Sequence, residues 1–350
     1  MLKELVDTLY ERNILEKDEL TLLIRSGEGD DEVLRLICEA ALQTKLRIYG
    51  KGIFLRALIE FTNHCKNSCR YCGIRKENRK VRRYRLSPEQ ILNCSRNAWE
   101  NGYRTVVLQG GEDVWFTTPR IVDLIGRIKE ACPGMAVTLS IGERSGEEYA
   151  EFFAAGVDRF LLRHETTSES VYRRMHPGMS FSNRFRCLKD LKAIGFQTGA
   201  GFIVGLDEET PSRLADELLF LKALDADMVG IGPLVPHPDT PLAGYEKGSI
   251  RTTLLMIALT RLLLPDTLLP VSTAFNTLTT NGWQMGFDAG ANVLMPVLTP
   301  ADERKAYEIY KDKQNVDSME LNRIYERIQQ TGSEVDPGRG DRKYFTGVRT

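Results

Sequence analysis

Eight short apolar or β-branched runs, separated by segments of helical periodicity, constrain the fold of this 350-residue chain more than any other feature. Strands joined through helices pair in parallel, and eight such units are the number that closes into a barrel. We therefore predict an α/β fold with a single (β/α)8 barrel of the TIM type, and an open doubly wound sheet is the alternative. The runs are residues 53–63, 105–112, 136–142, 159–165, 197–206, 227–236, 268–277 and 292–300.

Helical segments fall between the runs. Their apolar spacing predicts helices over residues 88–101, 181–194, 211–224 and 252–263, with Ser87, Ser180 and Thr210 as N-caps of the first three. We expect these helices to form the outer ring of the barrel.

The two ends of the chain differ from the repeating middle. Leu2, Leu5, Val6 and Leu9 share one helical face, and a second amphipathic helix is predicted over residues 30–44. We predict an N-terminal helical cap at residues 1–50, the barrel at 51–300, and a C-terminal helical extension and tail at 301–350 packed on the barrel. The polar stretch 331–350 is either an ordered wrap over the barrel or a loose terminus.

Charge and hydropathy exclude several classes of protein. The 47 basic and 48 acidic residues nearly cancel, so no overall field favours nucleic acid or an anionic membrane, although a local basic patch is compatible with this balance. No signal-peptide core opens the chain, and no apolar run approaches the roughly 20 residues of a membrane span. We expect a soluble, cytoplasmic protein.

Three of the seven cysteines lie within eight positions: Cys65, Cys69 and Cys72. This C-x3-C-x2-C spacing directly follows the first predicted strand, on the face where barrels carry chemistry. An odd, clustered set indicates a metal or redox site in a reducing compartment rather than disulfides. Three thiolates can hold a [4Fe–4S] cluster and leave one iron open for a ligand.

Two other interpretations of the three cysteines stay open. A structural zinc site needs a fourth ligand, for which only the adjacent His64 stands nearby in sequence, and a chance cluster of surface thiols is the second alternative. The remaining cysteines, which lie in predicted helices, are expected to be small buried hydrophobes: Cys38, Cys94, Cys132 and Cys187.

The cysteine motif, with Tyr71 before its last cysteine, resembles that of the radical S-adenosylmethionine (SAM) superfamily. The resemblance implies one [4Fe–4S] cluster on the three cysteines, with the amino and carboxylate groups of SAM on the open iron. Gly110, Gly111 and Glu112 are similar to the glycine-glycine-glutamate motif that meets the SAM amino group. Glycines allow close backbone approach and a carboxylate complements an ammonium group.

Further stretches over about residues 54–300 resemble the HydE family of [FeFe]-hydrogenase maturases, in the group that includes biotin synthase and methylornithine synthase. They are RYRLSPEQIL, VVLQGGED, LLRHET, SFSNR, TGAGFIVGL, DMVGIGPLVPHPDTPL and GANVLMP. The resemblance implies that SAM is bound by Tyr71, Gly110, Gly111, Glu112, Ser140, Glu165 and Arg184. It implies a substrate site lined by Thr138, Arg163, Ser272, Thr273, Met295 and Tyr310, with Arg163 as the anion-binding group.

Each of these side chains also has a purely structural interpretation. Arg163 and Glu165 could form a buried ion pair, and Met295 could belong to the core. The hydroxyls of Thr138, Ser272 and Thr273 could bond backbone groups. The turn at residues 236–242 either shapes the mouth of a pocket or is only a turn.

Two departures from the related families narrow the function. Some HydE proteins carry extra cysteines near the C-terminus, but residues 310–325 contain none, which excludes a second cluster there. Biotin synthase needs a [2Fe–2S] cluster with ligands on barrel strands, whereas TGAGFIVGL contains no cysteine. The sequence therefore argues against biotin synthase.

The predicted activity is reductive cleavage of SAM to a 5′-deoxyadenosyl radical that attacks a small substrate inside the barrel. The resemblance implies a cysteine-bound iron carbonyl cyanide precursor of the hydrogenase H-cluster, a reductant such as ferredoxin or flavodoxin, other hydrogenase maturases as partners, and a monomer. A lysine mutase similar to methylornithine synthase and a non-catalytic iron–sulfur carrier or scaffold are the alternatives.

Overall fold

A ring of parallel strands organises the molecule, which a computed structural model describes over residues 1–313 and 321–345. Six strands pair in the order β2-β3-β4-β5-β6-β8, every pair parallel. Bridges Met228–Leu268 and Pro270–Val293 continue the ring, and the bridge Leu58–Val297 closes it against β2. The predicted barrel is confirmed, because an open sheet would leave β2 and β8 as unconnected edges.

The strands of the described residues are short. They are β1 Gly52–Leu55, β2 Ala57–Thr62, β3 Thr105–Gly110, β4 Ala136–Ser140, β5 Arg159–Leu161, β6 Gln197–Ala200, β7 Ile203–Val204, β8 Met228–Val229, β9 Gly232–Pro233, β10 Val293–Leu294 and β11 Glu334–Asp336. Strands β7 and β9, which follow β6 and β8 in the chain, pair with each other. Strand β1 pairs with β10 and β11.

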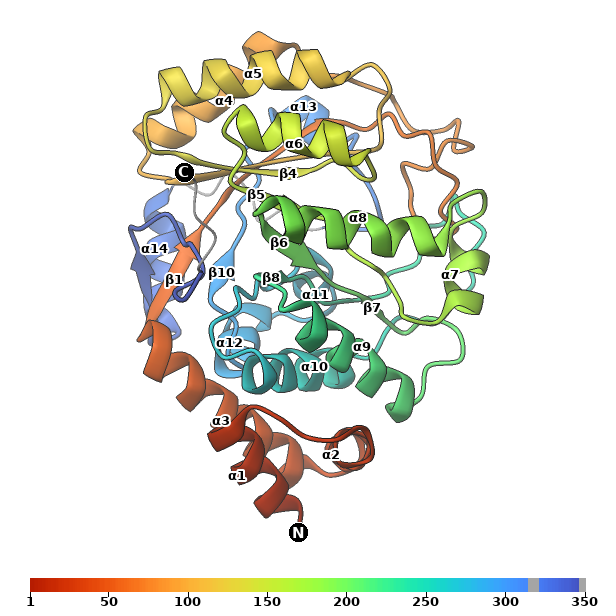
Figure 1. Cartoon of the computed structure of the whole chain (residues 1–350), viewed down its shortest axis with the longest axis vertical. Helices are drawn as coiled ribbons and strands as arrows, with labels where there is room; N and C mark the ends of the chain where they lie inside the picture. The colour runs from red at the N-terminus through yellow and green to blue at the C-terminus, as the bar shows by residue number, and fades with distance from the viewer. Residues whose placement is uncertain (314–320, 346–350) are drawn as a thin grey trace.

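Helices surround the ring of strands, with α1–α3 in a further layer at one end (Figure 1). They are α1 Leu2–Arg12, α2 Lys17–Gly29, α3 Asp31–Tyr49, α4 Pro88–Glu100, α5 Thr118–Ala131, α6 Gly146–Ala154, α7 Glu169–Met175, α8 Phe181–Ile194, α9 Pro211–Leu224, α10 Ile250–Leu263, α11 Thr273–Leu278, α12 Gly282–Asp288, α13 Ala301–Arg304 and α14 Leu321–Gln330. No helix among the described residues is both long and apolar enough to cross a membrane.

The predicted helices agree closely with α4, α8, α9 and α10, and the three predicted N-caps are confirmed. The hydroxyls of Ser87, Ser180 and Thr210 each accept a hydrogen bond from a backbone N–H three residues later. Each cap satisfies a donor that the first helical turn leaves without a partner. Local chemistry therefore sets where these helices begin.

The predicted strand at 268–277 is wrong in its second half. Only Leu268 and Pro270 make strand-type bridges, and the chain enters α11 at Thr273. The Ser272 hydroxyl accepts a hydrogen bond from the Phe275 N–H and so caps this helix. A capping serine ends the extended run earlier than its apolar composition suggested.

Alternation along the strands separates two sets of buried side chains. Ile59 and Phe61 of β2 belong to the large core beneath the outer helices. Leu58 of the same strand packs with Val107 and Val297, against which Met295 lies. Since side chains at successive positions point to opposite faces of a sheet, the second set fills the inside of the barrel.

The N-terminal helices α1–α3 form an additional layer at one end of the molecule (Figure 1). Helix α2 packs on α9, and α3 packs on α10. The layer thus covers the outer helices rather than the ends of the strands.

The C-terminal tail wraps the barrel as far as it is described. Strand β11 pairs with β1, and the following residues reach the amino ends of the strands. Asp341 accepts hydrogen bonds from the buried side chains of Arg159 and Gln197, the first residues of β5 and β6. The tail is therefore an ordered wrap, and residues 346–350 lie outside the described residues.

Arg342 joins the tail to the barrel most extensively. Its guanidinium is bidentate to Asp266, with both N–O distances 2.8 Å, and it also binds Asp227 at 3.0 Å and Asp225 at 2.8 Å. Asp227 is fully buried, so its charge depends on such partners.

We expect Arg342→Ala to lower the free energy of unfolding by about 2–4 kcal/mol, because it leaves buried carboxylates with too few partners. Urea unfolding of the metal-free protein measures this change. Arg323→Ala, on an exposed position of α14, is the matched control and should stay within about 0.5 kcal/mol of the parent. Equal effects of the two variants would contradict a sealing role for the tail.

Candidate active site

The three cysteines lie on the loop between β2 and α4, at the carboxyl end of the first barrel strand. Burial raises the pKa of Cys65, of Cys69 and, to about 12, of Cys72; the neighbouring thiols raise the pKa of Cys69 and Cys72 further. The three thiols are thus close enough to sense one another's charge. Without metal they are protonated at neutral pH, so loading a metal centre must release protons.

Arg83 holds the backbone of this loop in place. Its guanidinium donates to four carbonyl oxygens, those of Asn63, Ile74, Arg75 and Asn78. No sequence motif marked Arg83 as a site residue. Its only signal was its place in a run of basic residues that follows the motif.

The number of thiols on the loop suits a cluster better than a single zinc ion. Within the described part of the chain, no three His, Cys, Asp or Glu side chains converge as one metal ion requires. A tetrahedral zinc site draws its ligands to about 2.0–2.3 Å from one point, whereas in a cubane each thiolate binds its own iron. The donor set of three thiols therefore fits a [4Fe–4S] cluster.

The Gly110–Gly111–Glu112 segment ends β3 directly against the cysteine loop. A Cβ atom on Gly111 would lie 2.3 Å from the His64 carbonyl oxygen and 2.7 Å from the Cys65 Cβ, so only glycine fits there. The Glu112 carboxylate accepts the Glu143 N–H at 3.1 Å and lies 3.3 Å from Lys66 Nζ. The motif thus places a nearly buried carboxylate beside the cysteines.

Arg163 and Glu165 follow β5 and face each other, with Arg163 Nη2 3.1 Å from Glu165 Oε2. The ion pair considered from the sequence therefore exists in this structure. Its hydrogen bonding is incomplete among the described residues, because the contact at Glu165 Oε2 does not have hydrogen-bond geometry and Arg163 Nε is buried without a hydrogen-bond partner. Polar atoms of this kind are where a ligand's polar groups would complete the bonding.

Glu165 is also held in an unusual backbone conformation, with φ of 68°. A non-glycine residue rarely adopts this left-handed region. The conformation is enforced on both sides, because the Glu165 N–H donates to the Gly201 carbonyl at 3.0 Å and its carbonyl accepts the Ile203 N–H at 3.2 Å. The side chain is thereby presented over the barrel rim.

Arg184 of α8 is nearly buried and engaged with a residue that the sequence analysis missed. Its Nε donates to Glu143 Oε1 at 2.7 Å and its Nη1 donates to the Arg163 carbonyl at 2.7 Å. Burial acts to lower the pKa of Arg184, but nearby acidic groups, Tyr172 and Glu143 foremost, outweigh it and raise the pKa. Glu143 could have been noticed as the acid that follows the predicted strand 136–142.

Tyr71 is tied to α7 through His176, a second missed residue. The Tyr71 hydroxyl lies 2.8 Å from His176 Nε2, and His176 Nδ1 lies 3.0 Å from the Tyr172 carbonyl. Burial lowers the pKa of His176 to about 4, so the ring is neutral at pH 7. Because Nδ1–H must donate to the carbonyl, Nε2 accepts from Tyr71, and this network assigns the tautomer.

The residues expected to bind substrate come from a strand, a helix and the loops between elements. Thr138 is buried on β4, and its hydroxyl has no hydrogen-bond partner among the described residues. Ser140, which was expected to bind SAM, ends the same strand opposite Gln109. The hydroxyls of Thr273 and Tyr310 bond each other, and the charge of Arg163 reaches Tyr310. Ser272 serves as the α11 cap, and Met295 packs inside the barrel.

A buried ion pair inside the barrel was also missed. Glu60 of β2 binds Lys313, and both side chains are almost fully buried. Among the described residues, the second carboxylate oxygen of Glu60 has no hydrogen-bond partner. Burial raises the pKa of Glu60, an effect that Lys313 only partly offsets. No sequence pattern marked Glu60, since it lies in the middle of an apolar run.

Comparison with known proteins identifies the relatives of the chain. Residues 59–221 match the model of the radical SAM superfamily. The [FeFe]-hydrogenase maturase subunit HydE of Thermotoga maritima is 43% identical over 89% of this chain and 88% of its own length.

Two solved structures have the same fold. A methylornithine synthase (PylB) aligns with a TM-score of 0.83 and 25% identity over 95% of this chain and 97% of its own. The maturase HydG of Carboxydothermus hydrogenoformans aligns with a TM-score of 0.80 and 21% identity over 95% of this chain and 78% of its own. With the three-thiol loop and the superfamily match, the extent of the HydE similarity shows that this chain belongs to the radical SAM superfamily and, within it, to the HydE family of [FeFe]-hydrogenase maturases.

Proposed function

We propose that this enzyme cleaves SAM reductively and uses the product radical on a small, cysteine-bound iron carbonyl cyanide precursor during maturation of the hydrogenase H-cluster. The observation that carries the proposal is the loop of three thiols, which leaves one cluster iron without a protein ligand, next to Glu112, Glu165 and Arg184. The family is that of hydrogenase maturases, so maturation is the process in which the enzyme acts.

A [4Fe–4S] cluster and SAM are the cofactors of the family and of this enzyme. When bound by Cys65, Cys69 and Cys72, the cluster supplies the electron that splits SAM into methionine and a 5′-deoxyadenosyl radical.

The residues around the cysteine loop would bind and orient SAM. Glu112 offers a carboxylate to the SAM amino group, and Glu165 offers one to the ribose hydroxyls or the sulfonium. Arg184 presents a planar guanidinium suited to the methionine carboxylate, and Glu143 fixes its orientation. Gly110, Gly111, Tyr71 and Ser140 would complete the SAM site.

The interior of the barrel would hold the substrate. Arg163 would bind an anionic group, with Thr138, Ser272, Thr273, Met295 and Tyr310 around it. We add Glu60, whose unpartnered buried oxygen can accept a hydrogen bond from substrate. Enclosure by the barrel would shield a radical from water and from side reactions.

The wider setting is proposed on the same basis. The reductant would be a ferredoxin or flavodoxin, other hydrogenase maturases would receive or supply the precursor, and the enzyme would act as a cytoplasmic monomer. The division into a helical cap at 1–50, a barrel at 51–300 and an extension at 301–350 belongs to the same proposal.

The two alternatives are less well supported. A lysine mutase would align this chain with methylornithine synthase, but the solved structure of that enzyme is only 25% identical, compared with 43% for HydE. A non-catalytic carrier would not need the acidic and basic groups that surround the cysteine loop.

Replacing any one of the three cysteines by alanine should lower deoxyadenosine formation about 100-fold or more, because the cluster loses a ligand. The measurement is anaerobic reconstitution with iron and sulfide, followed by dithionite and SAM. Cys94→Ala, on α4 and away from the loop, is the matched control and should retain cluster and activity. A fully loaded wild-type cluster that never cleaves SAM would favour the carrier instead.

Arg184→Lys should weaken SAM binding about 10–100-fold and leave the cluster spectrum intact, because lysine keeps the charge but loses the planar fork. Equilibrium binding of SAM to the reconstituted protein measures this. Arg186→Lys, exposed on the same helix, should bind SAM normally. Unchanged SAM affinity in Arg184→Lys would remove this residue from the site.

A further inference from the structure

The charge of the chain is concentrated around the cysteine motif, in residues 66–85, which we call the basic loop. Nine of its twenty residues are basic and one, Glu77, is acidic, whereas the other 330 residues carry 38 basic and 47 acidic side chains. The net charge of the whole chain is near zero because a strongly positive segment is balanced by a net negative charge on the other residues. A separation of this kind creates a local field that steers a charged partner.

Three cations of the basic loop, Arg75, Arg83 and Arg85, have structural partners. Arg83 binds four backbone carbonyls, and Arg85 forms an ion pair with the buried Asp113 at 2.7 Å. Arg75 donates to the Ser68 carbonyl and pairs with Glu77. These contacts explain the positions of three cations of the basic loop, but they do not explain why other cations of the loop are exposed.

The outward-facing cations are exposed: Lys76, Arg79, Lys80 and Arg82. Lys80 pairs with Asp239, and Arg82 donates to the Asp302 carbonyl. Across the described residues, neither Lys76 nor Arg79 makes a side-chain hydrogen bond or an ion pair. Their charges are therefore available to a partner.

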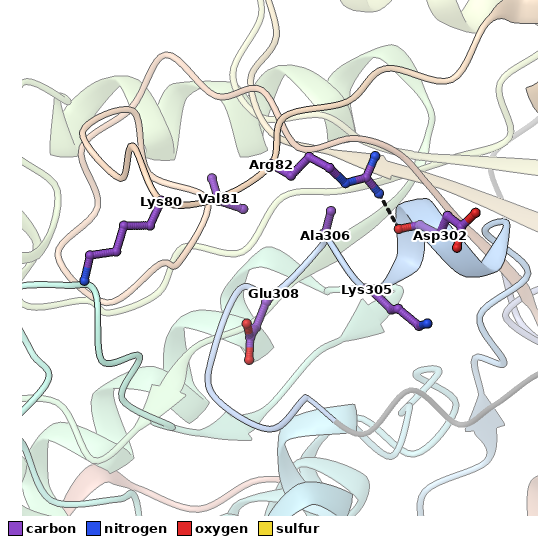
Figure 2. Close-up of a pocket in the computed structure, with 7 residues that line it drawn as sticks. All are labelled: Lys80, Val81, Arg82, Asp302, Lys305, Ala306 and Glu308. Carbon is purple, nitrogen blue, oxygen red and sulfur yellow. Dashed lines mark hydrogen bonds between the residues drawn. The ribbon is translucent and has the colours of Figure 1, made fainter.

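A surface pocket of about 590 Å³ opens beside these cations. Figure 2 shows Lys80, Val81 and Arg82 on one wall, facing Asp302, Lys305, Ala306 and Glu308 on the other. Lys305 adds a further exposed cation at its edge, and no hydrogen bond or ion pair of its side chain occurs among the described residues.

The pocket lies directly behind the cysteine loop. The wall at 306–309 is bonded to that loop at two points, because the Asn63 amide donates to the Ala306 carbonyl at 2.7 Å and the Gly73 N–H donates to the Ile309 carbonyl at 2.8 Å. Gly73 follows Cys72, and a Cβ there would lie 2.1 Å from the Glu308 carbonyl. A partner seated in the pocket would be separated from the cysteines by little more than this backbone.

We propose that the basic loop and its pocket are the docking surface for an acidic one-electron carrier protein. The carrier would be oxidised by one electron and the cluster that Cys65, Cys69 and Cys72 would hold reduced by one, and SAM cleavage would then consume that electron. This inference rests on the proposed function. A nucleic acid fits the surface less well, because Asp302 and Glu308 in the pocket would repel its phosphates.

The test reverses only cations without described partners, in the triple variant Lys76→Glu, Arg79→Glu, Lys305→Glu. Lys3→Glu, Lys51→Glu, Arg323→Glu makes the same charge change at exposed positions outside the basic loop and is the matched control. Both variants and the wild type are reconstituted with the cluster. Each is mixed in stopped flow with a pre-reduced bacterial ferredoxin, and the rate constant of cluster reduction is recorded.

At low ionic strength we expect the rate constant of the first variant to be at least about tenfold below that of the control. The difference should vanish near 1 M salt, where the screening length falls to about 3 Å. The single-turnover yield of deoxyadenosine with excess dithionite should be the same in all three proteins, because dithionite does not need the surface.

Equal ferredoxin rates in the two variants would overturn the docking surface. So would normal ferredoxin rates combined with loss of binding to a DNA duplex, which would make the surface a nucleic-acid site. Failure of the wild type to form deoxyadenosine with dithionite would instead overturn the proposed function, so the two failures are distinguishable.

Discussion

Hydrogen bonds between parallel strands position the cysteine loop, Glu112 and Glu165 together, because the carboxyl ends of parallel strands meet at one rim. Strand β2 leads into the cysteine loop, β3 into Gly111 and Glu112, and β5 into Glu165. These strands follow one another in the ring with β4 between β3 and β5. A few residues beyond each strand are enough to bring together groups that lie 100 residues apart in the chain.

Charged side chains are buried at both ends of the barrel, but they have different partners there. At the amino end, Arg342 of the tail forms ion pairs with three aspartates, and the Arg159 guanidinium forms an ion pair with Asp341. At the carboxyl side, Glu60 and Glu165 each have a buried oxygen without a hydrogen-bond partner in the part of the chain that the structure describes. Arg56 Nε at the amino end also lacks one among the described residues, and each of these buried charged groups has a desolvation cost. That cost is removed when a ligand completes the bonding.

Glycine and strain explain how the rim comes so close to the cysteines. Gly111 is required because the β3 extension runs against the backbone of His64 and Cys65. Glu165 accepts a left-handed backbone because its N–H and carbonyl are both used by the chain at 201–203. Outliers of this kind persist only where the surrounding structure enforces them, and they often mark functional sites.

Local sequence determined much of the fold. Helices α8 and α9 begin and end where the apolar spacing and the caps Ser180 and Thr210 predicted, because capping and amphipathicity are local properties. The apolar run at 268–277 led to a wrong strand prediction in its second half, because its composition does not reveal that Ser272 caps a helix. The closing bridges of the ring, at Leu58 and Pro270, also depend on segments distant in sequence.

The sequence by itself determined the chemistry that is encoded within a few residues: three thiols on one loop, and two glycines with a glutamate after one strand. Only the tertiary structure decided the partners, because a partner's identity depends on which segments the fold brings together. Glu143 against Arg184, Lys313 against Glu60, and Arg83 against four carbonyls of the cysteine loop all follow from folding. No spacing in the chain marks these pairs, since their members are joined through space and not along the sequence.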